Sequence, residues 1–251
     1  MAAVAAFAFV AGLLIGSFVT VVAHRVPVGE SIVWARSQCP WCGAQIAAYD
    51  NVPVLSWALL RGRGRCCGEP ISARYPLTEL GLGAAYAATV LVLWGDTTDI
   101  LLGLVFVTTL AVVTLTDLEL RLIPNRVLLV AVVLGVLIAA IGDPSSLPER
   151  AIAAAGAGGL LFAAALAYPR GMGLGDVKLA AVMGLFLGRG VVTAMFVALL
   201  SGSTVGIAMI VQGGMEARKR AIPFGPFLAL GGLVGLLWGP QLLDSYLGIF
   251  F

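Results

Sequence analysis

The chain has 251 residues, of which 60% are apolar and only 11% are charged, and its mean hydropathy is +1.03. A soluble domain carries about a quarter charged residues, so this composition excludes an ordinary soluble enzyme and indicates an integral membrane protein. The net charge of +2 is not concentrated in a long basic run, which argues against nucleic-acid binding.

Apolar tracts alternate with short polar turns along most of the chain. Each membrane-crossing helix needs roughly 20 mainly apolar residues, and the tracts predict about eight such helices. The expected spans are residues 2–23, 76–94, 99–116, 125–141, 150–168, 176–187, 191–212 and 224–239. The sixth span is short, so we expect it either to begin within residues 171–175 or to merge with its neighbour. The predicted fold class is an all-α polytopic membrane protein with a small cysteine-containing cytoplasmic loop subdomain.

No basic residue precedes the first apolar tract, whereas His24 and Arg25 follow it. A cleavable signal peptide places positive charge ahead of its apolar region, so we expect an uncleaved first helix with its N-terminus outside. The chain would then consist of a first transmembrane helix (1–23), a polar cytoplasmic loop (24–75) and a block of membrane spans (76–251).

The distribution of basic residues tests this orientation independently. With the polar loop inside, thirteen of the 15 lysines and arginines lie in inner segments, and only Arg150 and Arg189 lie in outer turns. The positive-inside rule predicts this asymmetry. The inner basic residues are Arg25, Arg36, Arg61, Arg63, Arg65, Arg74, Arg121, Arg126, Arg170, Lys178, Arg218, Lys219 and Arg220.

Two aspartates at the inner membrane border are the candidate catalytic residues. Asp117 closes the third expected span and Asp176 opens the sixth, so alternating spans place both on the cytoplasmic side. A carboxylate at membrane depth is costly and is usually paired or functional. When two carboxylates lie close together, one keeps a proton while the other stays charged, and the pair can act as acid and base. Such a pair can activate water against a peptide carbonyl.

Other interpretations of these residues remain open at this point. Asp176 could cap the N-terminus of its helix, where negative charge is favoured, whereas Asp117 sits at a helix C-terminus, where the dipole disfavours it. Ion or proton transport also uses buried carboxylates, but the span centres here are almost free of charge. Gly173 and Gly175 allow the backbone to bend and another segment to approach. Lys178 is either an interfacial basic anchor or a group that tunes Asp176 or contacts substrate.

Six sequence blocks lie in order along the chain, at residues 16–27, 51–57, 71–76, 122–125, 173–176 and 222–229. Residues 173–176 read Gly-Leu-Gly-Asp, and Leu-Ile-Pro-Asn follows Asp117 at 122–125. With these blocks the chain resembles the type IV prepilin peptidases, which are bacterial GxGD aspartyl proteases.

The resemblance implies a multi-pass protease of the bacterial cytoplasmic (inner) membrane, with Asp117 and Asp176 as its catalytic pair. Its partners would be membrane lipid and the prepilins or pseudopilins of type IV pilus and type II secretion systems, whose basic leader it removes on the cytoplasmic side. Many such enzymes also methylate the new N-terminus with S-adenosylmethionine. A dedicated methyltransferase is the alternative enzyme class; it would need a donor site but could dispense with both aspartates.

All four cysteines, Cys39, Cys42, Cys66 and Cys67, lie in the polar loop, which indicates a local metal site or a redox pair. In many of the resembling proteins two CxxC pairs suggest zinc held by four thiolates. Here the first pair is intact, but Gly64 stands where the second pair would begin. Either Cys66 replaces the missing ligand, or three thiolates bind zinc with a fourth group, or the metal is absent. Structural zinc is the favoured expectation.

Overall fold

The computed structural model describes residues 1–31, 37–168, 172–217 and 222–250, which form two compact units, Met1–Val92 and Leu93–Phe251. Within these ranges the regular structure is helical, apart from two isolated β-bridges. Several residues used above lie outside the described ranges: Arg36, Arg170, Gly171, Arg218, Lys219 and Arg220.

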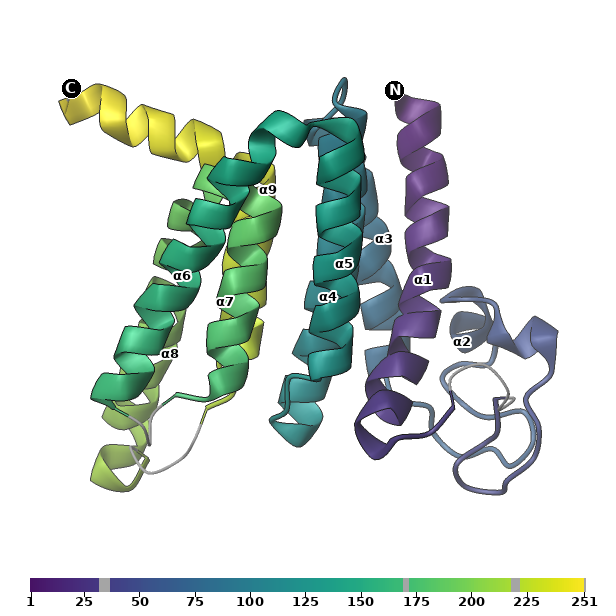
Figure 1. Cartoon of the computed structure of the whole chain (residues 1–251). Helices are drawn as coiled ribbons and strands as arrows, with labels where there is room; N and C mark the ends of the chain where they lie inside the picture. Colours follow the sequence, from purple (N-terminus) through teal and green to yellow (C-terminus); the bar gives the residue numbers. More distant parts are fainter. Residues whose placement is uncertain (32–36, 169–171, 218–221, 251) are drawn as a thin grey trace. The chain divides into compact units, whose positions relative to one another are not determined.

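The first unit contains two long helices, α1 (Ala2–Val28) and α3 (Arg74–Val92), which lie side by side (Figure 1). A Cβ added at Gly12 would lie 2.7 Å from the Cα of Gly83, so the missing side chain permits this close approach. The helix α1 is longer than the expected span 2–23, because its backbone bonding continues past the first polar residues. It ends at Gly29, which adopts a left-handed conformation with a φ of 75°.

Between α1 and α3, residues 37–73 contain two short helical pieces, η1 (Ala48–Asn51) and α2 (Leu55–Leu59). Between them Val54 has a φ of 62°, an unfavourable conformation for a β-branched residue. The Val54 N–H donates a 2.7 Å hydrogen bond to Oε2 of Glu79, a carboxylate of α3 that is only 6% exposed. Glu79 thereby fixes the block 51–57 to α3. This residue was not among those predicted from the sequence.

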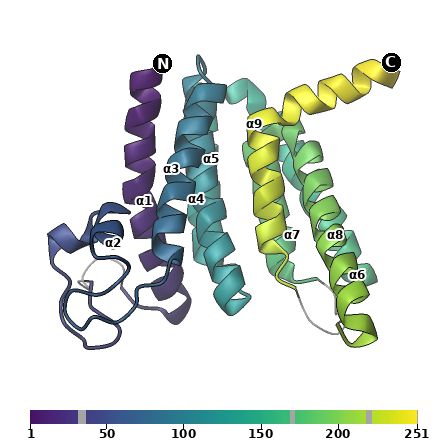
Figure 2. The ribbon, with the colours of Figure 1, turned by 180° about the vertical axis from the view of Figure 1, so that it is seen from behind.

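The described residues of the second unit form six long helices and two 3-10 turns, η2 (Pro144–Ser146) and η3 (Gly188–Gly190). The helices are α4 (Thr97–Leu120), α5 (Asn125–Gly142), α6 (Leu147–Ala167), α7 (Leu174–Leu187), α8 (Val191–Ala217) and α9 (Gly225–Phe250). Figures 1 and 2 show that successive helices run in opposite directions. The C-terminus of α4 and the N-termini of α7 and α9 therefore share one end of the unit, here called the aspartate end. The opposite end, where α4 begins and α7 finishes, is called the far end.

Six stretches of the described residues are long and apolar enough to cross a membrane, which confirms an all-α polytopic membrane protein. They are Ala2–Val28, Thr97–Leu120, Asn125–Gly142, Pro144–Ala167, Leu174–Gln212 and Gly225–Gly248. The fifth stretch includes both α7 and α8, and α3 is not in this set, so eight crossings remain a prediction. The helix α7 begins at Leu174, inside the expected interval. The helix α9 continues beyond the expected end at residue 239, with Pro240 inside it.

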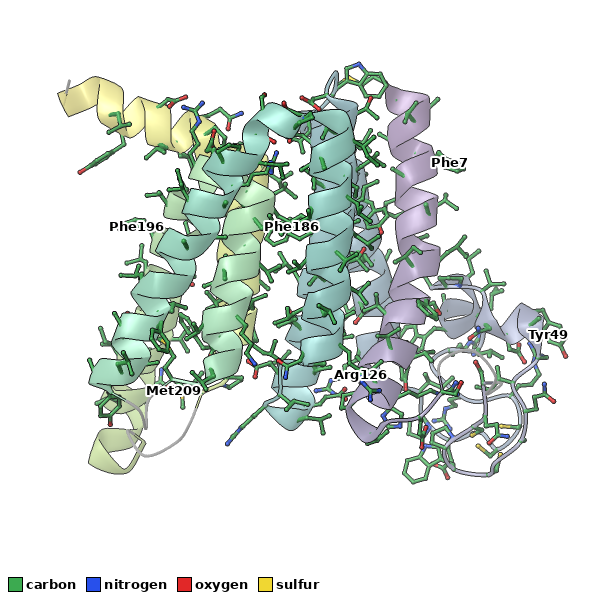
Figure 3. The ribbon with its side chains drawn as sticks, viewed as in Figure 1. Phe7, Tyr49, Arg126, Phe186, Phe196 and Met209 are labelled. Atoms are coloured by element: carbon green, nitrogen blue, oxygen red, sulfur yellow. The ribbon has the colours of Figure 1, made fainter. Side chains whose placement is uncertain are left out.

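The two helices that carry the aspartates are also joined through the core. Phe106 of α4 and Phe186 of α7 are buried and stacked, with ring centroids 5.3 Å apart (Figure 3 labels Phe186). Gly232 of α9 lies against this pair, since a Cβ there would come within 3.1 Å of the Phe106 ring. Aromatic stacking adds to the apolar burial, so α4, α7 and α9 share a core away from the aspartate end, near the last turn of α7.

Candidate active site

Asp117 lies in the last turn of α4 and is 6% exposed. Its Oδ2 accepts a 2.8 Å hydrogen bond from the backbone N–H of Gly225, the first residue of α9. The N–H groups that begin a helix lack intrahelical acceptors, and they carry the positive end of the helix dipole. Asp117 is disfavoured at the C-terminus of its own helix, but here the N-terminus of a different helix stabilises it.

Asp176 is the third residue of α7, and Gly173 is the residue that caps this helix. The Oδ2 atom of Asp176 accepts a hydrogen bond from the Gly173 N–H at 3.2 Å, the return bond of a capping box. The helix-capping contact considered for Asp176 is therefore present. It uses one carboxylate oxygen and directs the half-buried side chain to the aspartate end.

The segment after Asp117 ties α4 to the start of α7. A Cβ added at Gly175 would come within 3.1 Å of the Ile123 Cβ, so this glycine permits close contact with the 122–125 block. In the second turn of α7, Lys178 Nζ donates a 3.0 Å hydrogen bond to Asn125 Oδ1. Lys178 thus binds the chain that follows Asp117 and not either aspartate, among the contacts of the described residues.

The structure brings Asp117, Asp176, Gly173, Gly175 and Lys178 together at the aspartate end. The negative charge of Asp117 acts electrostatically on Asp176. Two carboxyl groups that lie close together can share one proton, so that one is a base and the other an acid. Gly225 was not among the predicted site residues. The start of a helix just after Pro223 was the sequence signal that could have identified its N–H as a donor.

The second predicted site is the cysteine cluster, whose Sγ atoms all lie within 4.8 Å of one another. Cys39 and Cys67 are 3.7 Å apart, Cys42 and Cys66 are 3.3 Å apart, and Cys66 and Cys67 are 3.8 Å apart. Tetrahedral zinc with Zn–S bonds of about 2.3 Å needs sulfur–sulfur separations of about 3.8 Å. The four thiols are free, and their spacing fits a four-thiolate metal site.

Two similar turns bring these cysteines together. In the first turn, Gln38 forms an isolated β-bridge with Gln45, and the Gly43 N–H donates to the Cys39 carbonyl. In the second turn, Arg63 forms an isolated β-bridge with Pro70, and the Gly68 N–H donates to the Gly64 carbonyl. The two turns therefore superimpose by position, with Gly64 in the place of Cys39 and Cys67 in the place of Cys42. Cys66 takes the place of Trp41, and its side chain joins the cluster. The second turn is held to η1 by Arg65, which donates to both carboxylate oxygens of Asp50.

The loop also distinguishes the thiols electrostatically. Backbone N–H groups of Cys42 and Trp41 lower the pKa of Cys39 to about 6. Hydrogen bonds with the thiols of Cys42 and Cys39 raise the pKa of Cys66 to about 12. The loop therefore favours the ionised form of the Cys39 thiol over that of the Cys66 thiol.

Two family models match successive parts of the chain. Residues 10–93 match the model of the bacterial Peptidase A24 N-terminal domain, and residues 104–211 match the type IV leader peptidase family. A prepilin leader peptidase/N-methyltransferase of Aeromonas hydrophila is 35% identical over 95% of this chain and 92% of its own. The chain belongs to the prepilin leader peptidase family. Similar proteins carrying the same name in Burkholderia pseudomallei (strain K96243) and Bacillus subtilis (strain 168) are 34% and 33% identical, over 93% and 95% of this chain and 85% and 96% of theirs.

No solved structure matches the chain significantly. The two family models divide this prepilin leader peptidase close to the boundary between its compact units at Val92 and Leu93. Both aspartates lie in the second unit, and all four cysteines lie in the first. The family therefore covers both candidate sites.

Proposed function

We propose that this prepilin leader peptidase cleaves the basic leader from type IV prepilins or pseudopilins with Asp117 and Asp176 as its catalytic pair. The observation that carries the proposal is the meeting of α4 and α7 at the aspartate end, where the Gly225 N–H holds Asp117. One carboxylate takes a proton from water, and the resulting hydroxide attacks the carbonyl carbon of the scissile bond. The other carboxylic acid gives its proton to the leaving nitrogen as the C–N bond breaks. A coupled pair titrates as a unit, so the proposal assigns neither role to one particular aspartate.

The aspartate end is proposed to face the cytoplasm of the bacterial inner membrane. Arg121, Arg126 and Lys178 lie at or next to this end, whereas Arg150 and Arg189 lie at the far end. Inner segments are the ones that carry excess Lys and Arg. A basic prepilin leader on the cytoplasmic side would then lie beside the catalytic pair.

The activity is tested directly by mass spectrometry of a prepilin incubated with the purified enzyme, with and without S-adenosylmethionine. Cleavage predicts a loss equal to the leader mass in both samples. The relatives' names include methyl transfer, and this second activity predicts a further methyl mass only with the donor. S-adenosylmethionine would supply that methyl group; we assign no residue to the step. A precursor of unchanged mass would contradict the proposed peptidase.

We further propose that the cysteine cluster holds a structural zinc ion through Cys39, Cys42, Cys66 and Cys67. The spacing of the four sulfur atoms supports this assignment. A metal would join the two turns of the loop and neutralise the charge that the thiolates carry.

The proposed division of the chain keeps residues 24–75 as the loop region associated with methyl transfer and residues 76–251 as the peptidase region.

Replacing Cys66 tests whether a vicinal cysteine serves as the fourth ligand. Cys66→Ser is expected to lower zinc from about one ion per chain to well below half, because structural zinc sites need four protein ligands. Gly64→Cys added to Cys66→Ser should restore the ion, since a Cβ at position 64 would lie 3.6 Å from the Cys67 sulfur and meet no closer atom. Metal content of the purified proteins is measured by atomic emission. Full zinc in Cys66→Ser alone would exclude Cys66 as a ligand.

A further inference from the structure

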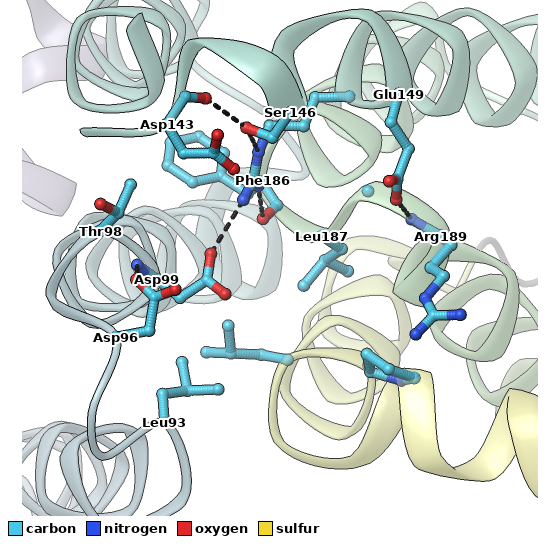
Figure 4. A pocket seen from close by; sticks show the side chains of 15 residues that line it. Leu93, Asp96, Thr98, Asp99, Asp143, Ser146, Glu149, Phe186, Leu187 and Arg189 are labelled. Carbon is cyan, nitrogen blue, oxygen red and sulfur yellow. Dashed lines mark hydrogen bonds and ion pairs between the residues drawn. The ribbon is translucent and has the colours of Figure 1, made fainter. Parts of the chain in front are cut away.

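A polar pocket of about 310 Å³ lies at the far end of the second unit, remote from both aspartates (Figure 4). It is lined by carboxylates and two arginines, together with the turn that ends α7. The charged side chains that line it are Asp96, Asp99, Asp143, Glu149, Arg150 and Arg189. The peptidase chemistry described above uses none of them.

Arg150, in the first turns of α6, is 8% exposed and binds three different elements. Its Nη2 forms a 2.9 Å ion pair with Oδ1 of Asp99, in the first turn of α4. Its Nη1 donates to the Phe186 carbonyl at 2.7 Å, in the last turn of α7, and its Nε donates to Ser146 Oγ at 3.0 Å. Figure 4 labels the three residues that this guanidinium binds, Asp99, Ser146 and Phe186.

These bonds suit the C-terminus of α7 physically. The last carbonyls of a helix lack intrahelical donors and form the negative end of its dipole, where a cation is favoured. A planar guanidinium can hold a carbonyl and a carboxylate at the same time, which an ammonium group does less well. Arg150 is thus built to fasten the end of α7 to the beginning of α4.

The length of α7 shows why such a fastening matters. It has 14 residues, or about 21 Å at 1.5 Å per residue, and is shorter than the hydrocarbon core of about 30 Å. Lipid alone therefore does not fix the depth of α7. Asp99 and Asp117 are 18 residues apart on α4, which is about 27 Å along the helix axis. Because Arg150 joins Asp99 to the last turn of α7, it sets the axial position of α7 relative to Asp117.

We propose that Arg150 is a positioning residue that fixes the axial register of α7 against α4, and thereby the relative depth of Asp176 and Asp117. This inference rests on the proposed catalytic pair. A register shift of about one residue moves Asp176 by about 1.5 Å. Displacements of about 1 Å can lower a rate about 100-fold.

Arg150→Ala tests the proposal by the pH dependence of prepilin cleavage. We expect kcat to fall between about 10-fold and 100-fold with KM changed less than about 2-fold, and the bell-shaped pH profile of kcat to become narrower. The two apparent pKa values of a carboxylate pair move closer together when the carboxylates separate. Arg121 and Lys178, the basic groups beside the pair, are unchanged in this variant. Arg150→Lys, which keeps the charge, should recover part of kcat and of the profile width.

Arg189→Ala is the matched control, because Arg189 lines the same pocket but pairs with Asp244 of α9. It should leave kcat and the pH profile as in the wild type. Asp99→Asn provides a second variant in case Arg150→Ala does not fold. We expect it to narrow the pH profile as Arg150→Ala does, but to a smaller extent.

The outcomes separate this inference from the catalytic assignment. A wild-type pH profile and kcat per folded enzyme in both Arg150→Ala and Asp99→Asn, with Asp117→Asn inactive, would overturn the positioning role alone. A wild-type rate in Asp117→Asn would instead overturn the catalytic pair on which the inference depends. Lower thermal stability of Arg150→Ala with an unchanged profile would show a purely structural role and also overturn the proposal.

Discussion

Asp117→Asn and Asp176→Asn are each expected to lower prepilin cleavage by about 10²- to 10⁴-fold, the range contributed by acid–base catalysis. Asparagine keeps the size of the side chain and an acceptor oxygen, so the bonds from Gly225 and Gly173 can persist. An amide cannot exchange the proton that the reaction requires. The measurement is the initial rate of leader removal by equal amounts of folded enzyme, followed by mass spectrometry.

Asp96→Asn is the matched control for these two variants. Asp96 caps the other end of α4 by accepting a 3.0 Å hydrogen bond from the Asp99 N–H, and asparagine caps helices as well as aspartate does. Cleavage by this variant should stay within about 2-fold of the wild type, because the cap contact is retained. A wild-type rate in Asp117→Asn or Asp176→Asn would remove that residue from the catalytic pair.

Gly225→Ala is expected to lower kcat about 100-fold, although it adds a single methyl group. The added Cβ would lie 2.7 Å from Asp117 Oδ2 and 3.1 Å from Asp117 Cβ, closer than such atoms normally approach. The Asp117 carboxyl group, or the helix end that carries either residue, must therefore shift, and we expect the 2.8 Å bond to Asp117 to be lost with it. The kinetic constants of the purified variant measure this effect.

Gly206→Ala in α8 controls for the general effect of replacing a membrane-helix glycine. A Cβ at this position meets no atom within 4 Å, and alanine is the better helix former. This variant should cleave prepilin at the wild-type rate, and thermal unfolding of both variants in detergent identifies any loss of folded protein. Full activity of Gly225→Ala would show that the contact with Asp117 is dispensable.

The sequence predicted the location of both aspartates because the alternation of membrane spans is a strong, local signal. Apolar tracts fix where each span ends, and counting the crossings between Asp117 and Asp176 places them on the same side. The long apolar helices confirm the membrane class, and the start of α7 at Leu174 lies within the predicted interval. The expected end of α1 at residue 23 was too early, because polar residues can continue a helix beyond the apolar tract.

The partners of these residues could not be predicted, because they depend on tertiary contacts between distant segments. The bond from Gly225 to Asp117 joins residues 108 positions apart, and a backbone N–H leaves no trace in the side-chain pattern. Arg150 was assigned only an outer-turn charge, and its link between Asp99 and the end of α7 depends on three helices meeting. Cys66 was among the predicted metal ligands, whereas the similarity of the two turns that brings it to the other thiols is visible only in the structure.

The most direct test of the whole account is an experimental structure of the active enzyme with a prepilin peptide bound. We predict that the carboxyl groups of Asp117 and Asp176 lie on the same side of the membrane, flank the scissile carbonyl and are close enough to bind one water between them. That arrangement requires a separation of about 5.6 Å or less between the nearest oxygens of the two carboxyl groups, because a shared water forms two hydrogen bonds of about 2.8 Å each. Carboxyl groups on opposite faces of the membrane, or too far apart for a common water, would contradict the proposed hydrolysis.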